Sequence, residues 1–127
     1  MGLRDFFKPR TDRSDESAAP KDPDQAVLKQ LRKIGANLSK PREVIHFLYF
    51  PTQVAAEKAS TQLRGEGYAI DVRPAANADQ NPPNPWLMEA RIHAVIDETT
   101  VAPMRAKFED LAAAGSGEYD GWEAAAD

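Results

Sequence analysis

The two histidines, His46 and His93, are the side chains that would most readily supply a metal ligand or a general base. Each lies in an apolar stretch with the pattern of a β-strand, and neither has a second nitrogen or sulfur ligand at a recognised spacing. The sequence contains no cysteine, which excludes disulfides, thiolate zinc sites and cysteine nucleophiles. We therefore interpret both histidines as structural and expect no metal site.

The other reactive side chains also lack a catalytic pattern. Ser39, Ser60 and Ser116 lie in no nucleophile motif, and the sequence has no glycine-rich phosphate loop. Charged residues alternate with apolar ones on strand-like stretches; these are Asp71, Arg73, Glu89 and Arg91. Neighbouring strands ordinarily join such residues in cross-strand ion pairs rather than in a catalytic dyad. The sequence thus predicts a protein that is not an enzyme and that uses no cofactor.

The most distinctive short stretch is EYDGWE, residues 118–123, near the end of the chain. Asp120 and Gly121 favour a turn, because glycine tolerates a positive φ and Asp can bond to its own backbone. We expect Tyr119 and Trp122, on either side of this turn, to bury their rings against an open edge of a sheet. The protein-binding surface that we predict here consists of Glu118, Tyr119, Asp120, Gly121, Trp122 and Glu123. Its acidic side chains would remain in water.

The charge distribution favours a basic protein partner over a nucleic acid. The net charge is -4, and residues 108–127 include no Lys or Arg. Nucleic-acid binding needs clustered Lys and Arg to contact phosphates. Base stacking on Phe47 or Tyr49 is the alternative, but residues 86–96 offer no matching glycine-aromatic pattern. We therefore expect weak, non-specific RNA binding and attraction of a basic protein segment.

The chain of 127 residues is long enough for one domain. Residues 1–22 have almost no apolar content after Phe7, so we predict a disordered leader there and a folded domain at residues 23–127. Leu3, Phe6 and Phe7 could form an amphipathic turn that touches a membrane or a protein groove, or could have no role. Because no apolar run approaches the roughly 18 residues needed to span a bilayer, and no secretory signal is present, we expect a cytoplasmic protein.

Three amphipathic helices are predicted from capping residues and apolar spacing. The first begins at Pro23, where Asp22 and Gln25 give a capping-box pattern; Thr52 caps the second, and Thr99 or Thr100 the third. A glycine ends each helix: Gly35, then Gly65 or Gly67, then Gly115. The apolar stripes are Val27, Leu28, Leu31 and Ile34 in the first helix, Ala55, Ala59 and Leu63 in the second, and Val101, Met104, Phe108, Leu111 and Ala112 in the third.

The strands lie between these helices. Residues 43–50 are apolar on both faces, as expected of a central strand, whereas residues 68–73 and 86–96 alternate as half-buried strands do. The order of elements predicts an α+β fold, a ferredoxin-like split βαβ sandwich with an additional N-terminal helix. Residues 117–126 would form its fourth strand or an irregular edge in the same place.

Two motifs give the chain a resemblance to a known family. One is EYDGW after a helix, and the other is the PRxxxHxxYF pattern formed by Pro41, Arg42, His46, Tyr49 and Phe50. Over residues 24 to about 123 the sequence resembles the family of the regulator of ribonuclease activity B, a ribonuclease E inhibitor. Some members carry a long acidic C-terminal extension, whereas this chain ends at Asp127.

The resemblance implies a ferredoxin-like fold, no catalytic residues and a cytoplasmic, bacterial setting. It also implies control of RNA turnover by binding of a ribonuclease, through a basic segment, rather than by binding of RNA. An alternative is a binding or immunity-type module of the same fold that has an unrelated protein partner and lies at a membrane through its leader.

Overall fold

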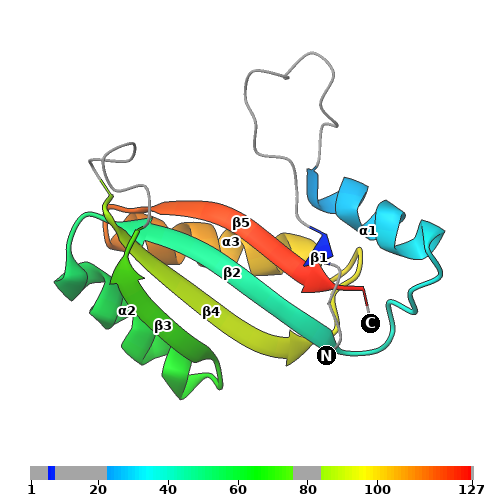
Figure 1. The fold of residues 1–127 in the computed structure, drawn as a ribbon, viewed down its shortest axis with the longest axis horizontal. Helices are drawn as coiled ribbons and strands as arrows, with labels where there is room; N and C mark the ends of the chain where they lie inside the picture. The colour runs from blue at the N-terminus through cyan, green and yellow to red at the C-terminus, as the bar shows by residue number, and fades with distance from the viewer. Residues whose placement is uncertain (1–5, 8–22, 76–83, 127) are drawn as a thin grey trace, which may run out of the picture.

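The computed structural model describes residues 6–7, 23–75 and 84–126. The five strands form one antiparallel sheet in the order β1-β5-β2-β4-β3 (Figure 1). Their bounds are β1 Phe6–Phe7, β2 Arg42–Phe50, β3 Ala69–Pro74, β4 Trp86–Ala94 and β5 Glu118–Ala125. The helices are α1 Pro23–Lys33, α2 Gln53–Gly65 and α3 Val101–Ala114. Without β1 and α1, this is the strand order and connectivity of the predicted ferredoxin-like sandwich, which is therefore confirmed.

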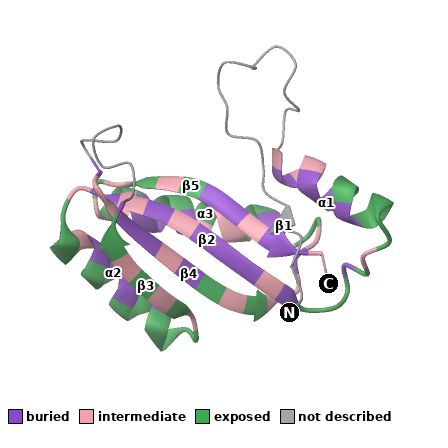
Figure 2. Ribbon diagram, in the orientation of Figure 1, coloured by how far each residue is buried: buried purple, intermediate pink, exposed green. Residues whose placement is uncertain are grey.

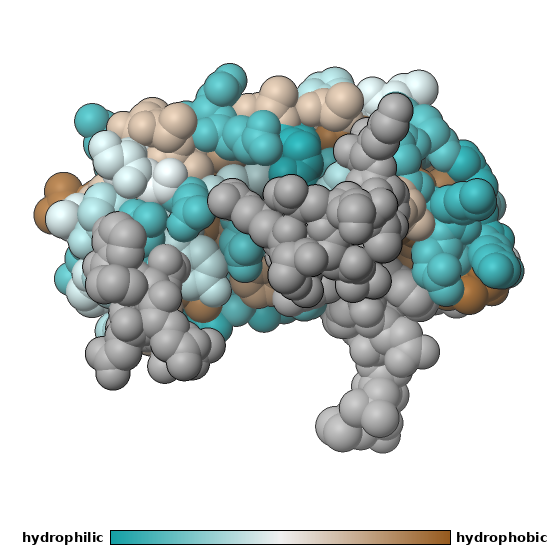
Figure 3. All heavy atoms as spheres, turned by 90° about the horizontal axis from the view of Figure 1, so that it is seen from above, coloured by the Kyte–Doolittle hydropathy of each residue, from teal (hydrophilic) through white to brown (hydrophobic). Residues whose placement is uncertain are grey.

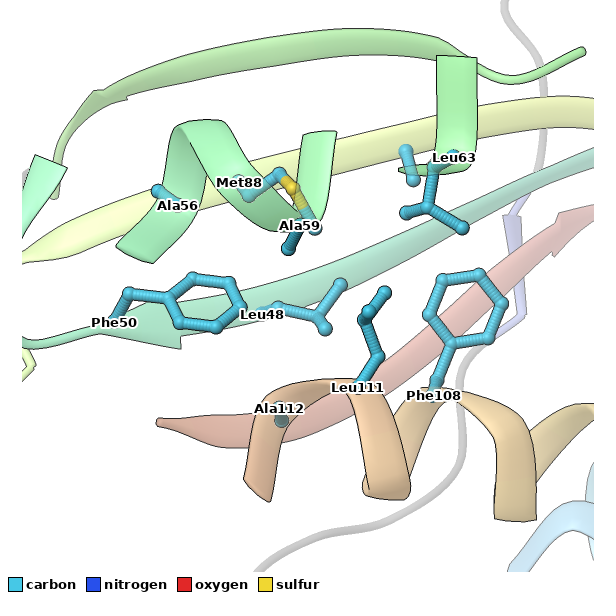
Figure 4. Packing of buried hydrophobic residues seen from close by; sticks show 10 residues of the cluster. Leu48, Phe50, Ala56, Ala59, Leu63, Met88, Phe108, Leu111 and Ala112 are labelled. Carbon is cyan, nitrogen blue, oxygen red and sulfur yellow. The ribbon is translucent and has the colours of Figure 1, made fainter. Parts of the chain in front are cut away.

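The hydrophobic core lies between one face of the sheet and the helices. Leu48 and Phe50 of the central strand β2 pack with α2 and α3, as Figure 4 shows. A second cluster joins α1 to the end of the sheet at Val44 and Trp122. Buried residues consequently run along β2 and β5 and along the inner sides of the helices (Figure 2).

The helix boundaries follow local chemistry. Thr52 caps α2 as predicted, since its side chain accepts a hydrogen bond of 3.1 Å from the backbone N–H of Ala55. Thr100 precedes α3 without a side-chain cap; the Asp97 carboxylate instead accepts from the backbone N–H groups of Thr99 and Thr100. Thr100 therefore occupies the predicted cap position of α3, but its side chain does not make the capping hydrogen bond, and Asp97, a residue type favoured at helix starts, accepts at this turn instead.

Two predicted apolar positions differ in the structure. Ile34 is 50% exposed, because α1 ends at Lys33 and the chain turns away at Gly35 with φ 91°. In α2, Ala56 is fully buried and Ala55 only partly, so the buried stripe starts one residue later than predicted. The predicted cap Asp22 lies outside the described residues.

Most of the predicted leader also lies outside the described residues, so the domain boundary at residue 23 stays a prediction. Phe6 and Phe7 are described and form strand β1, which pairs with Ala125 and Ala124 of β5. This is extended backbone and not the amphipathic turn considered for these residues.

Residues 117–126 contain a continuous strand, β5, rather than a turn at Asp120 and Gly121. His46 of β2 lies opposite Trp122, and Leu48 lies opposite Tyr119. Two steps along β2 therefore correspond to three steps along β5, so β5 carries one extra residue, a β-bulge. Gly121 has φ 95° at this bulge, a backbone conformation that favours glycine.

We expect Gly121→Ala to destabilise the fold by about 1–2 kcal/mol, because a Cβ at positive φ strains the backbone of the bulge. Urea unfolding followed by circular dichroism measures this cost. Gly65→Ala is the matched control: Gly65 has no positive φ, and an added Cβ there meets nothing within 4 Å. Equal stability of the two variants would show that the bulge does not depend on glycine.

Candidate functional site

The bulge sorts the residues of EYDGWE between the two faces of the sheet. Cross-strand partners share a face, so Tyr119 and Trp122 point to the helix-covered side with their partners on β2. Glu118 and Glu123 lie opposite Tyr49 and Ile45 and share the helix-free side. In a regular strand, residues three apart would face opposite ways. The extra residue is what places both aromatic rings on one face and these acidic residues on the other.

The Trp122 indole closes the end of the core. Its side chain is 1% exposed and packs in the cluster that contains Leu28 and Leu31 of α1. Its Nε1–H donates a hydrogen bond of 2.9 Å to Oδ1 of Asp24, also on α1. Trp122 is therefore a core residue with a satisfied polar tip, as the prediction of ring burial required.

Asp24 is a buried carboxylate that joins three elements. Besides the Trp122 contact, it accepts hydrogen bonds of 2.6 Å and 2.8 Å from Nε and Nη2 of Arg105 on α3. This two-point contact with Asp24 raises the pKa of Arg105 above its already high ordinary value. Asp24 also lies in the first turn of α1, where the helix dipole favours a negative charge.

Tyr119 lies beside Arg105, the partner of Asp24. The central carbon of the Arg105 guanidinium is 5.3 Å from the centre of the Tyr119 ring. Its hydroxyl is 2.9 Å from Nδ1 of His46. Burial raises the pKa of the Tyr119 hydroxyl above its ordinary value, so this group is neutral at physiological pH. The ring also stacks on Phe108 of α3, with centroids 5.5 Å apart.

His46 is a structural histidine, as predicted. It is fully buried and stacks on Phe108 with ring centroids 3.8 Å apart. Its Nε2 is buried without a hydrogen-bond partner. Burial, with smaller effects of Lys107 and Arg105, lowers the pKa of His46 to about 3. A neutral, enclosed imidazole of this kind contributes packing rather than proton transfer.

Arg42 fixes the C-terminal end of β5 through hydrogen bonds to the backbone. The side chain is buried, and Nη1 donates to the backbone carbonyls of Ala125, at 2.9 Å, and Ala126, at 2.5 Å. Its Nη2 donates to the carbonyl of Asn37, at 2.8 Å. One guanidinium thus ties the loop after α1 to the last described residues of the chain.

The other residues of the PRxxxHxxYF pattern have different surroundings. Pro41 is exposed, and Tyr49 is half-buried on the helix-free face. Phe50 is fully buried, and a Cβ on Gly115 would come within 2.7 Å of its ring. Gly115, directly after α3, therefore lets the end of this helix pack closely on β2.

Glu118 and Asp120 are exposed, as predicted. Glu123 was also expected in water but is half-buried, and both Asp120 and Glu123 take part in interactions of their own. The structure thus separates the predicted binding residues into a buried aromatic pair and an acidic set at the surface. A protein-binding role for the latter is a proposal, developed below.

The charged residues on the outer face of β3 and β4 form the predicted ion pairs. Arg73 contacts Asp71 and also Glu89, at 2.6 Å, and Arg91 contacts Glu89 at 3.2 Å and Glu43 at 3.5 Å. His93 is exposed on this same face, whereas His46 is buried on the face that the helices cover. The two histidines consequently belong to opposite faces and do not form one site.

Within residues 6–7, 23–75 and 84–126, no group of acidic, His or Cys side chains could hold a metal ion. The helices in that part of the chain are all too short or too polar to cross a membrane.

Sequence reasoning missed the Asp24 and Arg105 pair. A signal was present, because Asp24 follows Pro23 in the first helical turn, but its distant partner could not be identified from the sequence.

A comparison with family models gives a match to the family described as regulator of ribonuclease activity B, over residues 21–124. This range covers most of the chain, and the chain belongs to that family. A search of curated proteins found no match.

We expect Trp122→Ala to lower the free energy of unfolding by about 3–5 kcal/mol, because it removes a large buried ring and leaves a cavity. Denaturant unfolding followed by far-ultraviolet circular dichroism measures the change. Trp86→Ala is the matched control, since Trp86 is only half-buried at the start of β4, and its loss should cost less. A Trp122→Ala protein as stable as the wild type would mean that the ring is not part of the core.

The buried imidazole also predicts a pH dependence. Because burial lowers the pKa of His46 from 6.5, its ordinary value, to about 3 in the folded state, only the unfolded chain gains this proton as the pH falls below 6.5 toward 3. Protonation of His46 has little effect on the free energy of unfolding above pH 6.5 and lowers it progressively from pH 6.5 toward pH 3. From pH 7 to pH 5 the loss is about 2 kcal/mol.

Urea unfolding at both pH values tests this expectation. His46→Phe should remove that part of the pH dependence, whatever it does to stability at pH 7. His93→Gln is the control, because His93 is exposed and its replacement should leave the slope unchanged. An unchanged slope in His46→Phe would contradict the expectation.

Proposed function

We propose that this member of the regulator family is a non-enzymatic protein that inhibits RNA turnover by binding a ribonuclease of the ribonuclease E type. The observation that carries the proposal is the family match over residues 21–124. That range includes all three helices, strands β2 to β4 and most of β5. The proposal therefore concerns the whole folded unit and not a local motif.

The use of polar side chains supports a binding role. Buried polar side chains of the described residues are committed to packing: His46 is neutral and enclosed, and Asp24 is engaged by Arg105 and Trp122. Arg42 is engaged by backbone carbonyls. Side chains used in this way fix the shape of a surface, and a fixed surface suits recognition of another protein.

Charge supports a basic segment as the part of the ribonuclease that is bound. Residues 108–127 include no Lys or Arg, and Glu118, Asp120 and Asp110 are exposed there. Negative charges at the rim of an interface accelerate encounter with a positive partner and repel RNA. We propose that the acidic side of residues 118–123 faces the ribonuclease, while Tyr119 and Trp122 hold it in place from the core.

The test is a cleavage assay with a purified ribonuclease E-type enzyme and a fluorescent single-stranded RNA. We expect the protein to slow cleavage in a saturable manner and to bind the enzyme directly in an interferometry measurement. Binding should weaken as salt rises, because exposed opposite charges are screened. Cleavage at an unchanged rate, with no binding of the enzyme, would contradict the proposal.

Two controls separate this mechanism from non-specific inhibition of ribonucleases and from protection of the RNA substrate. An unrelated ribonuclease acting on the same RNA should not be slowed. The protein should bind the RNA itself only weakly, since an acidic surface can release few counterions from a phosphate backbone. Sub-micromolar RNA affinity at physiological salt would indicate that the protein protects RNA by covering it, which is a different function.

A further inference from the structure

We propose that a second copy of this chain docks on the groove between α2 and α3, which goes beyond the function proposed above and does not depend on it. In a two-fold dimer both copies use the same surface, so that surface must be complementary to itself. Three features of the two helices meet this condition: the groove, an exposed apolar side chain beside it, and unlike charges on its two sides.

The groove is the first observation. It has a volume of about 340 Å³, at the lower end of the range for binding clefts. Ala59 of α2 and Leu111 of α3 point toward each other across the space between the helices, as Figure 4 shows. The residues that line the groove are Ala55, Lys58, Ala59, Gln62, Leu111, Ala114, Gly115 and Ser116. This lining is mostly apolar and built from small side chains, so it leaves room for a larger apolar side chain from outside.

The two helices run in opposite directions along the groove. Glu66, directly after α2, forms an ion pair with Lys107 of α3. At the other end, a Cβ on Gly115 would lie 3.5 Å from the Cβ of Ala55. The start of α2 therefore lies beside the end of α3.

An exposed apolar side chain beside the groove is the second observation. Val54 is 77% exposed and, with Ile34, is one of two large apolar side chains that the described residues leave in water. It precedes Lys58 by four residues, so the two are neighbours on the surface of α2. Figure 3 shows hydrophilic residues over much of the surface outside the grey atoms on the side that it views. A second copy that covers Val54 would remove an unusual patch of apolar area from water.

Unlike charges on the two sides of the groove are the third observation. Lys58 lines the groove on α2. Asp110 lies on α3 four residues before Ala114, which lines the groove, so the two are neighbours on that helix. Lys58 and Asp110 are both exposed, and neither forms an ion pair or a hydrogen bond within the part of the chain that the structure describes. Both charges are therefore available to a second copy.

These charges select one arrangement of the two copies. With the two-fold axis along the groove, α2 of each copy lies over α3 of the other, and Lys58 of one copy faces Asp110 of the other at two symmetric places. Val54, near the start of α2, then covers the end of α3 in the other copy. An axis across the groove would instead bring α2 against α2 and Lys58 against Lys58, and like charges in contact oppose docking.

Sedimentation velocity of the full-length protein over a series of concentrations tests the dimer. The groove is small, so we expect a dissociation constant in the micromolar range, as for interfaces at the low end of the size range. Lys58→Glu and Asp110→Lys should each weaken self-association by roughly tenfold or more, because each places like charges in contact at two symmetric places. Lys29→Glu is the matched control, since Lys29 is exposed on α1 and lies outside the groove.

A mixture of the two groove variants is the sharpest test of the arrangement. In a heterodimer, the carboxylate introduced at position 58 faces the ammonium introduced at position 110, and the unchanged Lys58 and Asp110 face each other at the second place. We therefore expect the mixture to associate as the wild type does, although neither variant does so alone. This recovery follows only from a two-fold contact between these two positions.

The apolar part of the contact has its own test. Val54→Ser should weaken self-association by roughly tenfold, because each copy loses an apolar side chain that docking buries. Ile34→Ser is the matched control: Ile34 is 50% exposed near the end of α1, outside the groove, and its replacement should leave self-association unchanged.

Three results would overturn the proposal. One is a protein that sediments as a monomer at every concentration. Another is a dimer that Lys58→Glu and Asp110→Lys leave intact, or that their mixture does not restore, because its interface must lie elsewhere. The third is a Val54→Ser protein that loses binding of the ribonuclease while self-association stays unchanged, which would assign the groove to that enzyme. Self-association as expected, without any binding of the ribonuclease, would support the dimer and reject the proposed function.

Discussion

The buried Asp24 carboxylate is the contact on which the arrangement of α1, α3 and β5 depends. It accepts from Arg105 and from Trp122, residues that are 81 and 98 positions away in sequence. A buried charge is costly unless every lone pair is used, so the three elements can pack only in the register that satisfies it. The extra N-terminal helix is thereby fixed to the sandwich by a polar contact as well as by its apolar stripe.

The same contact explains why the aromatic residues of EYDGWE are not available as an interface. Trp122 must face α1 to reach Asp24, and Tyr119 must face α3 to stack on Phe108 beside His46 of β2. Both conditions can be met three residues apart only if β5 carries an extra residue, which Gly121 at φ 95° makes possible. The bulge is therefore a consequence of core chemistry that also determines where the acidic side chains point.

Much of this fold could be predicted because local patterns and global packing agree. Thr52 and the apolar spacing of α2, or the alternation of β4, are properties of a few consecutive residues. Glu118 and Asp120 could likewise be expected in water. The contacts of Asp24, Arg42 and His46 could not be predicted, since each joins residues far apart in sequence. The turn expected at Asp120 and Gly121 was wrong for a related reason: the dipeptide permits a positive φ, but only the pairing with β2 decides between a turn and a bulge.

The backbone of β5 is fixed from the core and at its C-terminal end, which matters for any surface that this strand presents. Ordering a flexible strand on binding would cost conformational entropy for every residue fixed. In β5 that cost is already met during folding, because Trp122 and Tyr119 lock the strand from beneath and Arg42 holds its end at Ala125 and Ala126. The side chains buried in the core thus fix the backbone of β5, and under the proposed function this fixed strand would present its surface carboxylates to a basic partner at little further entropic cost.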